Sequence, residues 1–446
     1  MEIEKMYEIT GKYTKALITL DSLEETCISQ IVSFINHPAF TNPVAIMPDA
    51  HAGRGSCVGF TMPMGDKIIP AVIGVDIGCG VLFVNIGSKL NMELPLLDHK
   101  IRQRIPFGFT INDKPVLDMK KDFPWRRACS EAQKFALAYQ EKFGTGIDLP
   151  VYDMDWFTKK CASIGCDLGR AIKSICSLGG GNHALELGIS QSGDHWIMIH
   201  TGSRNFGKCI CEYWQDKAVK KVKKQSKEDT QKAIKDLKAT YTGKELYDQI
   251  KALKNAPDPV PEFGCADELR WLEGEDAHGY LFDMLFAQIY AEENRAQMMR
   301  VILDILKIET KDSIETVHNF IDFRDFIVRK GAVRSYLGER FVLPLNMRDG
   351  VLICEGKSSV PLNYSAPHGA GRVLSRSQAK KKIDLATFKE QMKDIYSTSV
   401  CQGTLDEAPD AYKDAKLIEE AIGPTAKIID RIKPILNMKA TEAEDA

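Results

Sequence analysis

The stretch at residues 75–80 reads Val75-Asp76-Ile77-Gly78-Cys79-Gly80 and follows an apolar run at 68–74. The apolar run predicts a buried strand. Asp76 and Cys79 then stand three positions apart in a glycine-rich turn, where glycine lets the backbone bend tightly and approach a ligand. A carboxylate and a thiolate at this spacing can hold one or two divalent metals, and a thiolate can bridge two ions. Because Asp and Gly also end many strands and Cys is a common small core residue, the turn alone leaves a structural role open.

The composition is that of an ordinary soluble globular protein, with 44% hydrophobic and 27% charged residues. A chain of 446 residues predicts roughly two or three domains, or one large α/β unit with insertions. The formal net charge is -2, from 59 basic and 61 acidic side chains, so the chain is no polycation. Any binding to nucleic acid must therefore use a local basic surface.

The first residues, Met1-Glu2-Ile3-Glu4-Lys5, lack the charged and apolar regions of a signal peptide. No apolar run reaches the roughly 18 residues that a membrane helix needs. The 12 cysteines are spread over the whole length, which is not the pattern of a small disulfide framework. We therefore expect a cytoplasmic protein with reduced thiols and no membrane partner.

Periodicity and turn residues place the expected elements along the chain. Helices are predicted over residues 23–35, 96–105, 130–143, 164–177, 280–306 and 375–382, and strands over 57–62 and 196–199. One more helix is expected within the tail at 417–438, before a frayed acidic end. A further strand, starting at Pro43, is expected to run into a loop with Asp49 and His51. Since sites are usually built on such loops, His51 is either a structural histidine or a site residue.

Two further glycine-containing turns carry imidazoles. Three glycines precede Asn182 and His183, and the strand at 196–199 ends in His200. With the first turn and one later histidine, the ligand-type residues are Asp76, Cys79, His183, His200 and His318. This mixed set of nitrogen, oxygen and sulfur donors exceeds what one tetrahedral zinc needs. It suits Mn²⁺, Zn²⁺ or a related ion, and it is large enough for two metals.

His368 stands apart from the ligand-type residues, after a proline and before small residues, with Arg372 close by in the chain. An imidazole so placed can act as a nucleophile toward a phosphorus centre. Metal ions would neutralise the charge that develops on the phosphoryl oxygens. Arg204 also suits phosphate, because guanidinium donors match its oxygens in a fork.

Residues 212–262 are rich in lysine and are expected to form a helical insertion, a pair of solvated helices followed by a proline-containing loop. The lysines either form an ordinary surface or lie over a nucleic-acid backbone, and charge patterning leaves both readings open. In the helix at 280–306, Asn294 and Arg295 are expected to make polar contacts. Met298 and Met299 suit core packing.

Taken together, these motifs strongly resemble those of the RtcB family, the GTP-dependent RNA ligases that join a 3′-phosphate to a 5′-hydroxyl. The matching segments occur in family order and cover about residues 40 to 440. They are Met47-Pro48-Asp49-Ala50-His51 with Gly53 and Gly55-Ser56, then 74–80, Gly181-Asn182-His183 with Glu186, 200–204, His318-Asn319, 329–332, and 368–372 with Ser375-Arg376. Each segment alone is a weak signal, but the combination is specific.

The resemblance implies a role for each matching residue. The implied ligands of two Mn²⁺ ions are Asp76, Cys79, His183, His200 and His318, with Cys79 as the bridge. His368 is the implied catalytic residue, which takes GMP from GTP. The implied nucleotide contacts are Asn182, Glu186, Arg204, Asn346, Gly369, Ala370, Gly371, Tyr412 and Lys439. The implied fold is α+β, a single large catalytic domain over 1–446, built on β-sheets around a metal-lined cleft and carrying the 212–262 insertion.

The resemblance also implies a reaction in three steps: GMP passes from GTP to His368, then to the RNA 3′-phosphate, and leaves when a 5′-hydroxyl attacks. A 2′,3′-cyclic phosphate end would first be opened by hydrolysis. The implied partners are RNA with 3′-phosphate or 2′,3′-cyclic phosphate ends, RNA with 5′-hydroxyl ends, and archease. The implied setting is RNA repair or tRNA splicing.

One segment departs from the family pattern. Pro344-Leu345-Asn346-Met347-Arg348-Asp349-Gly350 replaces a Gly-Ser-Met-Gly turn that many members carry. This favours a divergent branch and leaves the nucleotide and RNA-end preferences open. A phosphatase or nuclease that kept the metals and lost guanylylation is a second hypothesis, which the intact His368 argues against. A non-catalytic protein that binds RNA ends is a third, although such a protein rarely needs a complete ligand set.

Overall fold

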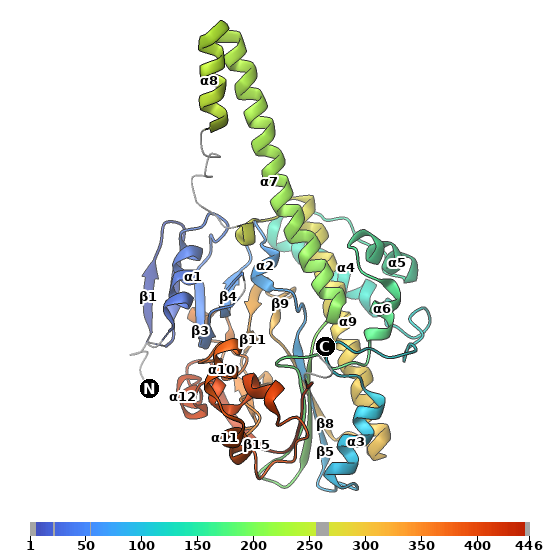
Figure 1. Ribbon diagram of the computed structural model, residues 1–446. Coiled ribbons are helices and arrows are strands. Elements are labelled where there is room, and N and C mark those ends of the chain that lie inside the picture. The colour runs from blue at the N-terminus through green and yellow to red at the C-terminus, as the bar shows by residue number, and fades with distance from the viewer. Residues whose placement is uncertain (1–5, 21–22, 54, 256–266, 442–446) are drawn as a thin grey trace.

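The computed structural model describes residues 6–441 except 21–22, 54 and 256–266, and it is built on two large β-sheets (Figure 1). The first sheet has six strands in the order β1-β2-β3-β4-β10-β9. Their bounds are Tyr7–Thr10 (β1), Lys15–Ile18 (β2), Val44–His51 (β3), Val58–Pro63 (β4), Ile327–Lys330 (β10) and Asn319–Asp322 (β9). The apolar residues 44–47 are all buried within β3, as expected of a strand that is covered on both faces.

The second sheet has seven strands in the order β12-β13-β15-β6-β7-β5-β8. Their bounds are Arg340–Pro344 (β12), Val351–Gly356 (β13), Ala426–Met438 (β15), Ala184–Ile189 (β6), His195–Thr201 (β7), Gly80–Gly87 (β5) and Asp312–Val317 (β8). The sheet curls into a nearly closed barrel, so that its two edge strands, β12 and β8, meet. There the Val342 backbone N–H in β12 donates to the Thr316 hydroxyl in β8 at 3.1 Å. Side chains from these strands form one core, in which the Phe83 and Trp196 rings stack 4.8 Å apart.

Between β8 and β9 a single residue connects the two large sheets. Strand β8 ends at Val317 in the second sheet, and β9 begins at Asn319 in the first, so His318 lies at the junction. A two-stranded sheet of β11 (Ala332–Arg334) and β14 (Ser365–Pro367) follows close by. The expected α+β fold is confirmed.

Twelve α-helices occur in the described part of the chain. Their bounds are Glu25–Ile35 (α1), Pro70–Ile73 (α2), Leu94–Arg104 (α3), Trp125–Phe143 (α4), Met154–Ser163 (α5), Leu168–Ser174 (α6), Arg204–Thr240 (α7), Gly243–Asn255 (α8), Glu275–Leu306 (α9), Arg376–Lys382 (α10), Leu385–Gln391 (α11) and Ala415–Ala421 (α12). The six helices predicted before the tail are confirmed by α1, α3, α4, α6, α9 and α10. None of the helices in these residues has the length and apolar character needed to cross a membrane.

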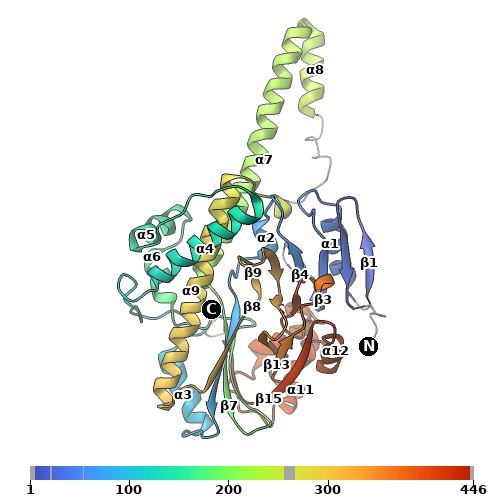
Figure 2. The same cartoon turned by 180° about the vertical axis from the view of Figure 1, so that it is seen from behind.

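Helix α9 runs along the second sheet and joins it to the helices α3 to α6 (Figure 2). Most of its residues are buried, including the polar residues Asp283, Asn294 and Arg295. Met298 and Met299 belong to the core beside the barrel, as predicted.

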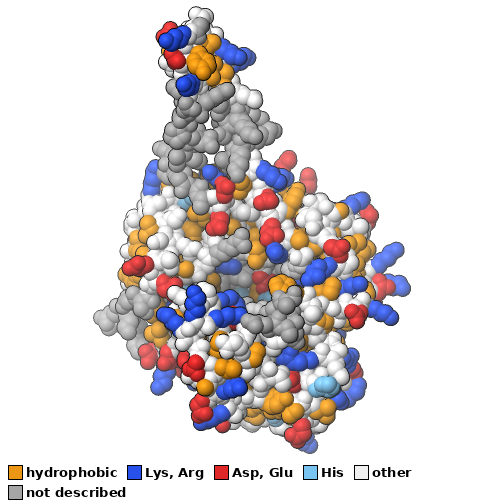
Figure 3. Space-filling model, viewed as in Figure 1, with side chains coloured by type: hydrophobic (Ala, Val, Ile, Leu, Met, Phe, Trp, Pro, Cys, Tyr) orange, Lys and Arg blue, Asp and Glu red, His pale blue; other side chains and the backbone are white. Residues whose placement is uncertain are grey.

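Helices α7 and α8 form a hairpin that projects from the rest of the molecule (Figure 1). They lie where the lysine-rich helical pair was expected, although α7 begins earlier, at Arg204. The proline-containing loop after them lies outside the described residues. Basic, acidic and hydrophobic side chains occur together at the tip of the hairpin (Figure 3). That residues 212–262 are an insertion in a single domain over 1–446 stays a prediction.

Three sequence-based expectations about local structure are wrong. Residues 70–73 form the short helix α2 instead of a strand, because Pro70 favours a first helical turn and Gly74, at φ +88°, ends it. Asp49 and His51 lie within β3 rather than on a loop. In the tail, helix α12 ends at Ala421, and 426–438 is the strand β15 between β13 and β6. An apolar run rich in isoleucine fits either element, and pairing on both sides decides for the strand. The expected acidic end, after residue 441, lies outside the described residues.

Candidate metal centre and nucleotide pocket

Four neighbouring strands bring the expected metal ligands to one end of the second sheet. The strands lie in the order β6-β7-β5-β8. In the register, Gly80 of β5 pairs with both Thr201 of β7 and Val317 of β8, and Ala184 of β6 pairs with His200. Cys79, His183 and His318 each lie next to one of these paired residues. The pairing therefore gathers donors from segments that are more than 200 residues apart in the chain.

The donor atoms form two groups that share the Cys79 thiol. In one group, the Cys79 Sγ lies 3.4 Å from the Nε2 of His200, which lies 3.2 Å from the Nε2 of His318. In the other group, the same Sγ lies 3.5 Å from the Nε2 of His183, which lies 2.8 Å from an Asp76 carboxylate oxygen. The structure thus brings together all five expected ligands, and it places Cys79 where a bridging thiolate would stand.

The protonation of the two innermost histidines suits metal binding. Burial lowers the pKa of both His200 and His318 well below the ordinary value. Both imidazoles are therefore neutral at physiological pH, with a ring nitrogen free to donate its lone pair. Burial and the nearby Asp76 raise the pKa of the Cys79 thiol, and a bound cation would reverse that effect by stabilising the thiolate.

Two polar residues of α9 hold the loops that carry these ligands. Arg295 is fully buried, and its guanidinium donates to the carbonyls of Gly78 and Thr201, both at 2.9 Å. Asn294 donates to the carbonyls of Ser177 and Gly202. The polar contacts expected of these two residues are confirmed, and they fix the backbone next to Cys79 and His200.

Position 202 must be glycine, because it lies directly against the Asp76 carboxylate. A Cβ at Gly202 would lie 2.1 Å from the Asp76 Oδ1, so any side chain there would push Asp76 out of the cluster.

The neighbouring His368 is held by a buried carboxylate from a different sheet. His368 follows β14, and its Nδ1 lies 2.6 Å from the Asp49 Oδ2 of β3. The same oxygen accepts the His368 backbone N–H at 3.1 Å, and Asp49 is completely buried. The His368 ring lies 4.8 Å from the His318 ring, centroid to centroid. Because the Asp49 carboxylate accepts a hydrogen bond from Nδ1–H, the unprotonated Nε2 is the nitrogen left to act as a nucleophile.

A pocket of about 650 Å³ opens beside His368 and His200. This volume lies in the range of small-molecule and cofactor sites. Its lining includes every expected nucleotide contact except Arg204, namely Asn182, Glu186, Asn346, Gly369, Ala370, Gly371, Tyr412 and Lys439. The structure therefore gathers these residues from five separate segments of the chain around one cavity.

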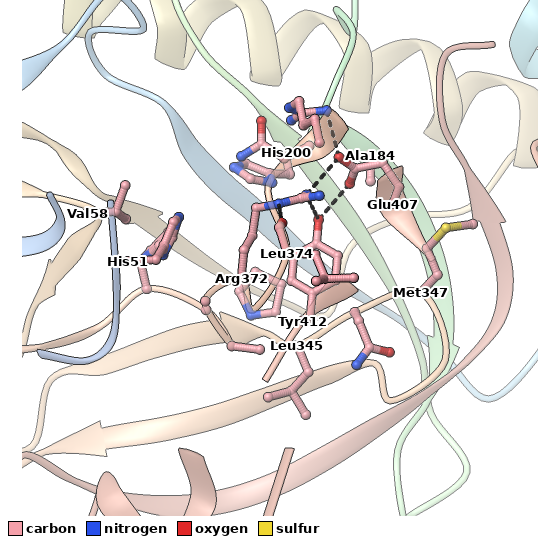
Figure 4. A pocket seen from close by; sticks show the side chains of 18 of the residues that line it. His51, Val58, Ala184, His200, Leu345, Met347, Arg372, Leu374, Glu407 and Tyr412 are labelled. Carbon is pink, nitrogen blue, oxygen red and sulfur yellow. Dashed lines mark hydrogen bonds and ion pairs between the residues drawn. The ribbon is translucent and has the colours of Figure 1, made fainter. Parts of the chain in front are cut away.

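A buried ion-pair network centred on Glu407 forms one wall of this pocket (Figure 4). The Glu407 carboxylate lies 2.9 Å from the Lys439 ammonium and 2.9 Å from the Arg376 guanidinium, and it accepts the Tyr412 hydroxyl at 2.7 Å. Arg372 lies over the Tyr412 ring and contacts the same carboxylate. Burial alone would raise the pKa of Glu407, but Lys439, Arg376 and Arg372 together hold it far below the ordinary value.

Two acceptors without partners lie at another wall of the pocket. Asn437 donates its amide to one Glu186 carboxylate oxygen at 2.8 Å. The other Glu186 oxygen and the Asn437 carbonyl oxygen are buried and have no hydrogen-bond partner among the residues that the structure describes. Burial raises the pKa of Glu186 to about 8. Orphaned buried acceptors are rare in proteins, and here both line a cavity where a ligand can donate to them.

Arg204 faces a second, smaller pocket of about 340 Å³. It shares that pocket with Asp76 and His183, whereas His200 and His368 line the larger one. The metal-ligand cluster therefore lies between two cavities.

Sequence reasoning missed two residues of the site and left a third open. Asp49 and Glu407 were not among the expected site residues, yet Asp49 holds His368 and Glu407 organises the pocket wall. The signal for Asp49 was present, since it belongs to a matching segment.

His51 lines the larger pocket, and burial lowers its pKa to about 4. Asn346 also lines it, but its side-chain amide is used within its own turn, donating to Asp349 at 2.7 Å.

Comparisons with known proteins identify relatives of the whole chain. The chain is 26% identical to the RNA-splicing ligase RtcB of Escherichia coli, over 94% of this chain and 95% of that protein. It is 25% identical to the RNA-splicing ligase RtcB of Mycobacterium tuberculosis, over 91% of this chain and 99% of the relative. The tRNA-splicing ligase RtcB of Nanoarchaeum equitans is 23% identical, over 90% and 89% of the two chains.

Fold and site define an α+β protein with a candidate metal centre between two pockets. The model of the family described as tRNA-splicing ligase RtcB matches residues 30–440, and the chain belongs to this family.

Proposed function

We propose that this protein is an RNA ligase that joins RNA 3′-phosphate or 2′,3′-cyclic phosphate ends to 5′-hydroxyl ends, in RNA repair or tRNA splicing. The observation that carries the proposal is the five-donor cluster directly beside a histidine whose Nδ1 is held by Asp49. Family membership supports the reaction class.

Two Mn²⁺ ions are proposed at the cluster, one held by Asp76, Cys79 and His183 and the other by Cys79, His200 and His318. When bound, such ions polarise phosphoryl oxygens and neutralise their charge. The mixed nitrogen, oxygen and sulfur donors suit Mn²⁺ or a related ion. Asn294 and Arg295 hold the ligand-bearing loops in place.

His368 is proposed as the nucleophile. The lone pair on its Nε2 forms a bond to the α-phosphorus of GTP, and pyrophosphate leaves with the electrons of the broken P–O bond. An oxygen of the RNA 3′-phosphate then attacks the same phosphorus, and the P–N electrons return to His368. Finally, the 5′-hydroxyl oxygen attacks the activated 3′-phosphate and passes its proton to solvent water, and GMP leaves with the electrons of the broken P–O bond. A 2′,3′-cyclic phosphate is first opened to the 3′-phosphate by water.

GTP is proposed as the nucleotide because of the two unpartnered acceptors in the larger pocket. Guanine presents adjacent N–H donors on its N1 and N2, and the free oxygens of Glu186 and Asn437 can accept them. Adenine presents an acceptor at N1, which would face these oxygens unfavourably. Lys439, 5% exposed and held by Glu407, adds a cation to the same cavity.

The test is self-labelling. The protein is incubated with Mn²⁺ and α-labelled GTP, and acid-labile label on the protein is measured. We expect label on the wild type and none on His368→Ala. His99→Ala, which removes an exposed histidine on α3 outside both pockets, is the matched control and should label normally.

Label that persists in His368→Ala would contradict the nucleophile. Joining of a 3′-phosphate strand to a 5′-hydroxyl strand then separates ligation from end trimming, since trimming alone would contradict the ligase. Adding archease to the joining assay tests whether turnover depends on such a partner.

A further inference from the structure

The second pocket has a lining that the proposed function leaves unused. One loop separates the two cavities, because Asn182, Ala184 and Glu186 line the larger pocket while Gly181 and His183 line the smaller. Gly181 and Asn182 form a turn, and from Ala184 the chain is the strand β6, in which Ala184 and Glu186 point to the same side. The smaller pocket therefore reaches the Asp76 and His183 side of the metal-ligand cluster without passing through the nucleotide pocket.

The charged lining of this second pocket is basic except for Asp76. Arg170, Arg204 and Lys208 all line it. Arg204 and Lys208 stand four residues apart on the first turns of α7, so they lie on the same face of that helix. Lys208 is exposed, and its ammonium lies 3.8 Å from the Glu212 carboxylate, a long and weak ion pair. Three cations around a cavity of this size suit a chain of phosphates.

An exposed aromatic ring lies at the same pocket. Phe109 is 67% exposed, yet its loop is fixed on both sides. Arg170 donates to the Phe109 carbonyl at 3.0 Å, and Arg204 donates to the Gly108 carbonyl at 2.7 Å. The Gly108 backbone N–H donates in turn to the Gly179 carbonyl at 3.0 Å. The same arginines that give the pocket its charge therefore hold an unburied ring in a defined position.

An exposed aromatic ring on a fixed loop, next to cations, is the arrangement by which proteins bind single-stranded nucleic acid. The ring stacks on a base and the cations follow the backbone. An aromatic ring that stays in water contributes no hydrophobic free energy to folding. A base stacked on the ring removes its apolar face from water, which is favourable.

We infer that the second pocket binds the 3′-terminal nucleotides of a single-stranded RNA, with the terminal phosphate toward Asp76 and His183 and a base stacked on Phe109. Arg170 and Lys208 contact the preceding phosphates. The assignment rests on the proposed ligase function, since it names where the phosphate-bearing strand lies while GTP occupies the other pocket. Phe109 is a binding residue here, and it takes no part in the attack by His368.

The experiment measures RNA binding without GTP. A six-nucleotide RNA with a 3′-phosphate and a 5′-fluorophore is titrated with protein in Mn²⁺, and fluorescence anisotropy gives the Kd. Phe109→Ala should raise Kd about tenfold, the effect of one lost base stack, and Phe109→Trp should restore it. Leu337→Ala removes a 77% exposed side chain outside both pockets and should leave Kd unchanged. Lys208→Ala should lower the slope of log Kd against log salt by about 0.7, the value for one phosphate contact on a single strand.

Two outcomes would overturn the inference: the same Kd for Phe109→Ala and wild type, or the same wild-type Kd for RNA ending in 3′-phosphate and 3′-hydroxyl. GTP labelling of His368 is measured in parallel in the wild type and in the Leu337→Ala control, and both should label normally. Failure of labelling in the wild type would contradict the proposed ligase. The comparison of RNA binding between wild type and Phe109→Ala would still test the pocket assignment, because it is measured without GTP. Normal labelling in the wild type, with unchanged RNA binding in Phe109→Ala, would contradict the pocket assignment alone.

Discussion

The Asp49 carboxylate accepts two hydrogen bonds from His368, one from its ring Nδ1 at 2.6 Å and one from its backbone N–H at 3.1 Å. The two residues are 319 positions apart in the chain and come from different sheets. Asp49 thus sets both the position of the imidazole and the nitrogen that carries its proton. The same division of work between a carboxylate and a histidine is found in hydrolase triads.

Asp49→Asn is expected to slow self-labelling by about 100-fold or more, because an amide N–H facing Nδ1 favours the tautomer with the proton on Nε2. The rate of label transfer from GTP measures the effect. Asp283→Asn is the control, since Asp283 is equally buried but pairs with Lys160 away from both pockets. An unchanged rate in Asp49→Asn, with normal thermal stability, would show that the carboxylate does not direct the imidazole.

Cys79→Ala is expected to abolish labelling, because both donor groups lose their shared ligand. Metal content, measured by mass spectrometry after dialysis against Mn²⁺, should fall from two ions toward none. The matched control is Cys354→Ala, which removes another fully buried thiol, within the strand β13. Retention of two ions by Cys79→Ala would remove the bridging role.

Glu186→Gln is expected to weaken GTP binding by about 10- to 100-fold, because an amide replaces one of the acceptors for guanine by a donor. The pKa of Glu186 is about 8 in the folded protein. The wild-type carboxyl is therefore mostly protonated at pH 6, and GTP affinity should rise between pH 6 and pH 8 as the carboxylate forms. Titration calorimetry at both pH values measures this. A pH dependence that survives in Glu186→Gln would assign it to another group.

Glu407→Gln is expected to lower the free energy of unfolding by about 3–5 kcal/mol, because Lys439, Arg376 and Arg372 lose the buried anion they share. The pKa of Glu407 is depressed in the folded state, so its contribution is fully present above the ordinary value of 4.5, begins to fall below that value, and is lost only as pH falls through the depressed folded-state pKa. Urea unfolding at pH 7 and pH 4 should show the difference between wild type and variant shrinking at the lower pH. A constant difference would place the effect elsewhere than in this carboxylate.

The ligand set could be anticipated from the sequence because each donor ends an apolar run or stands in a glycine turn, which is local information. The contact between Asp49 and His368 could not, since it depends on how two sheets meet. Glu407 was missed for a similar reason: an acidic residue in a short 3₁₀ segment gives no sign that three cations from distant segments surround it. The error at β15 is of another kind. Its isoleucine run is compatible with helix or strand, and only its two neighbours in the sheet decide.

Helix α7 starts at Arg204, in the second pocket, and continues without a break to Thr240 in the projecting hairpin. Its 37 residues make a rod about 55 Å long at 1.5 Å per residue. The first turn of this rod touches the cavity and its far end meets whatever approaches the hairpin from outside. The projecting hairpin and the second pocket therefore share one continuous helix, and no loop separates the Arg204 end from the Thr240 end.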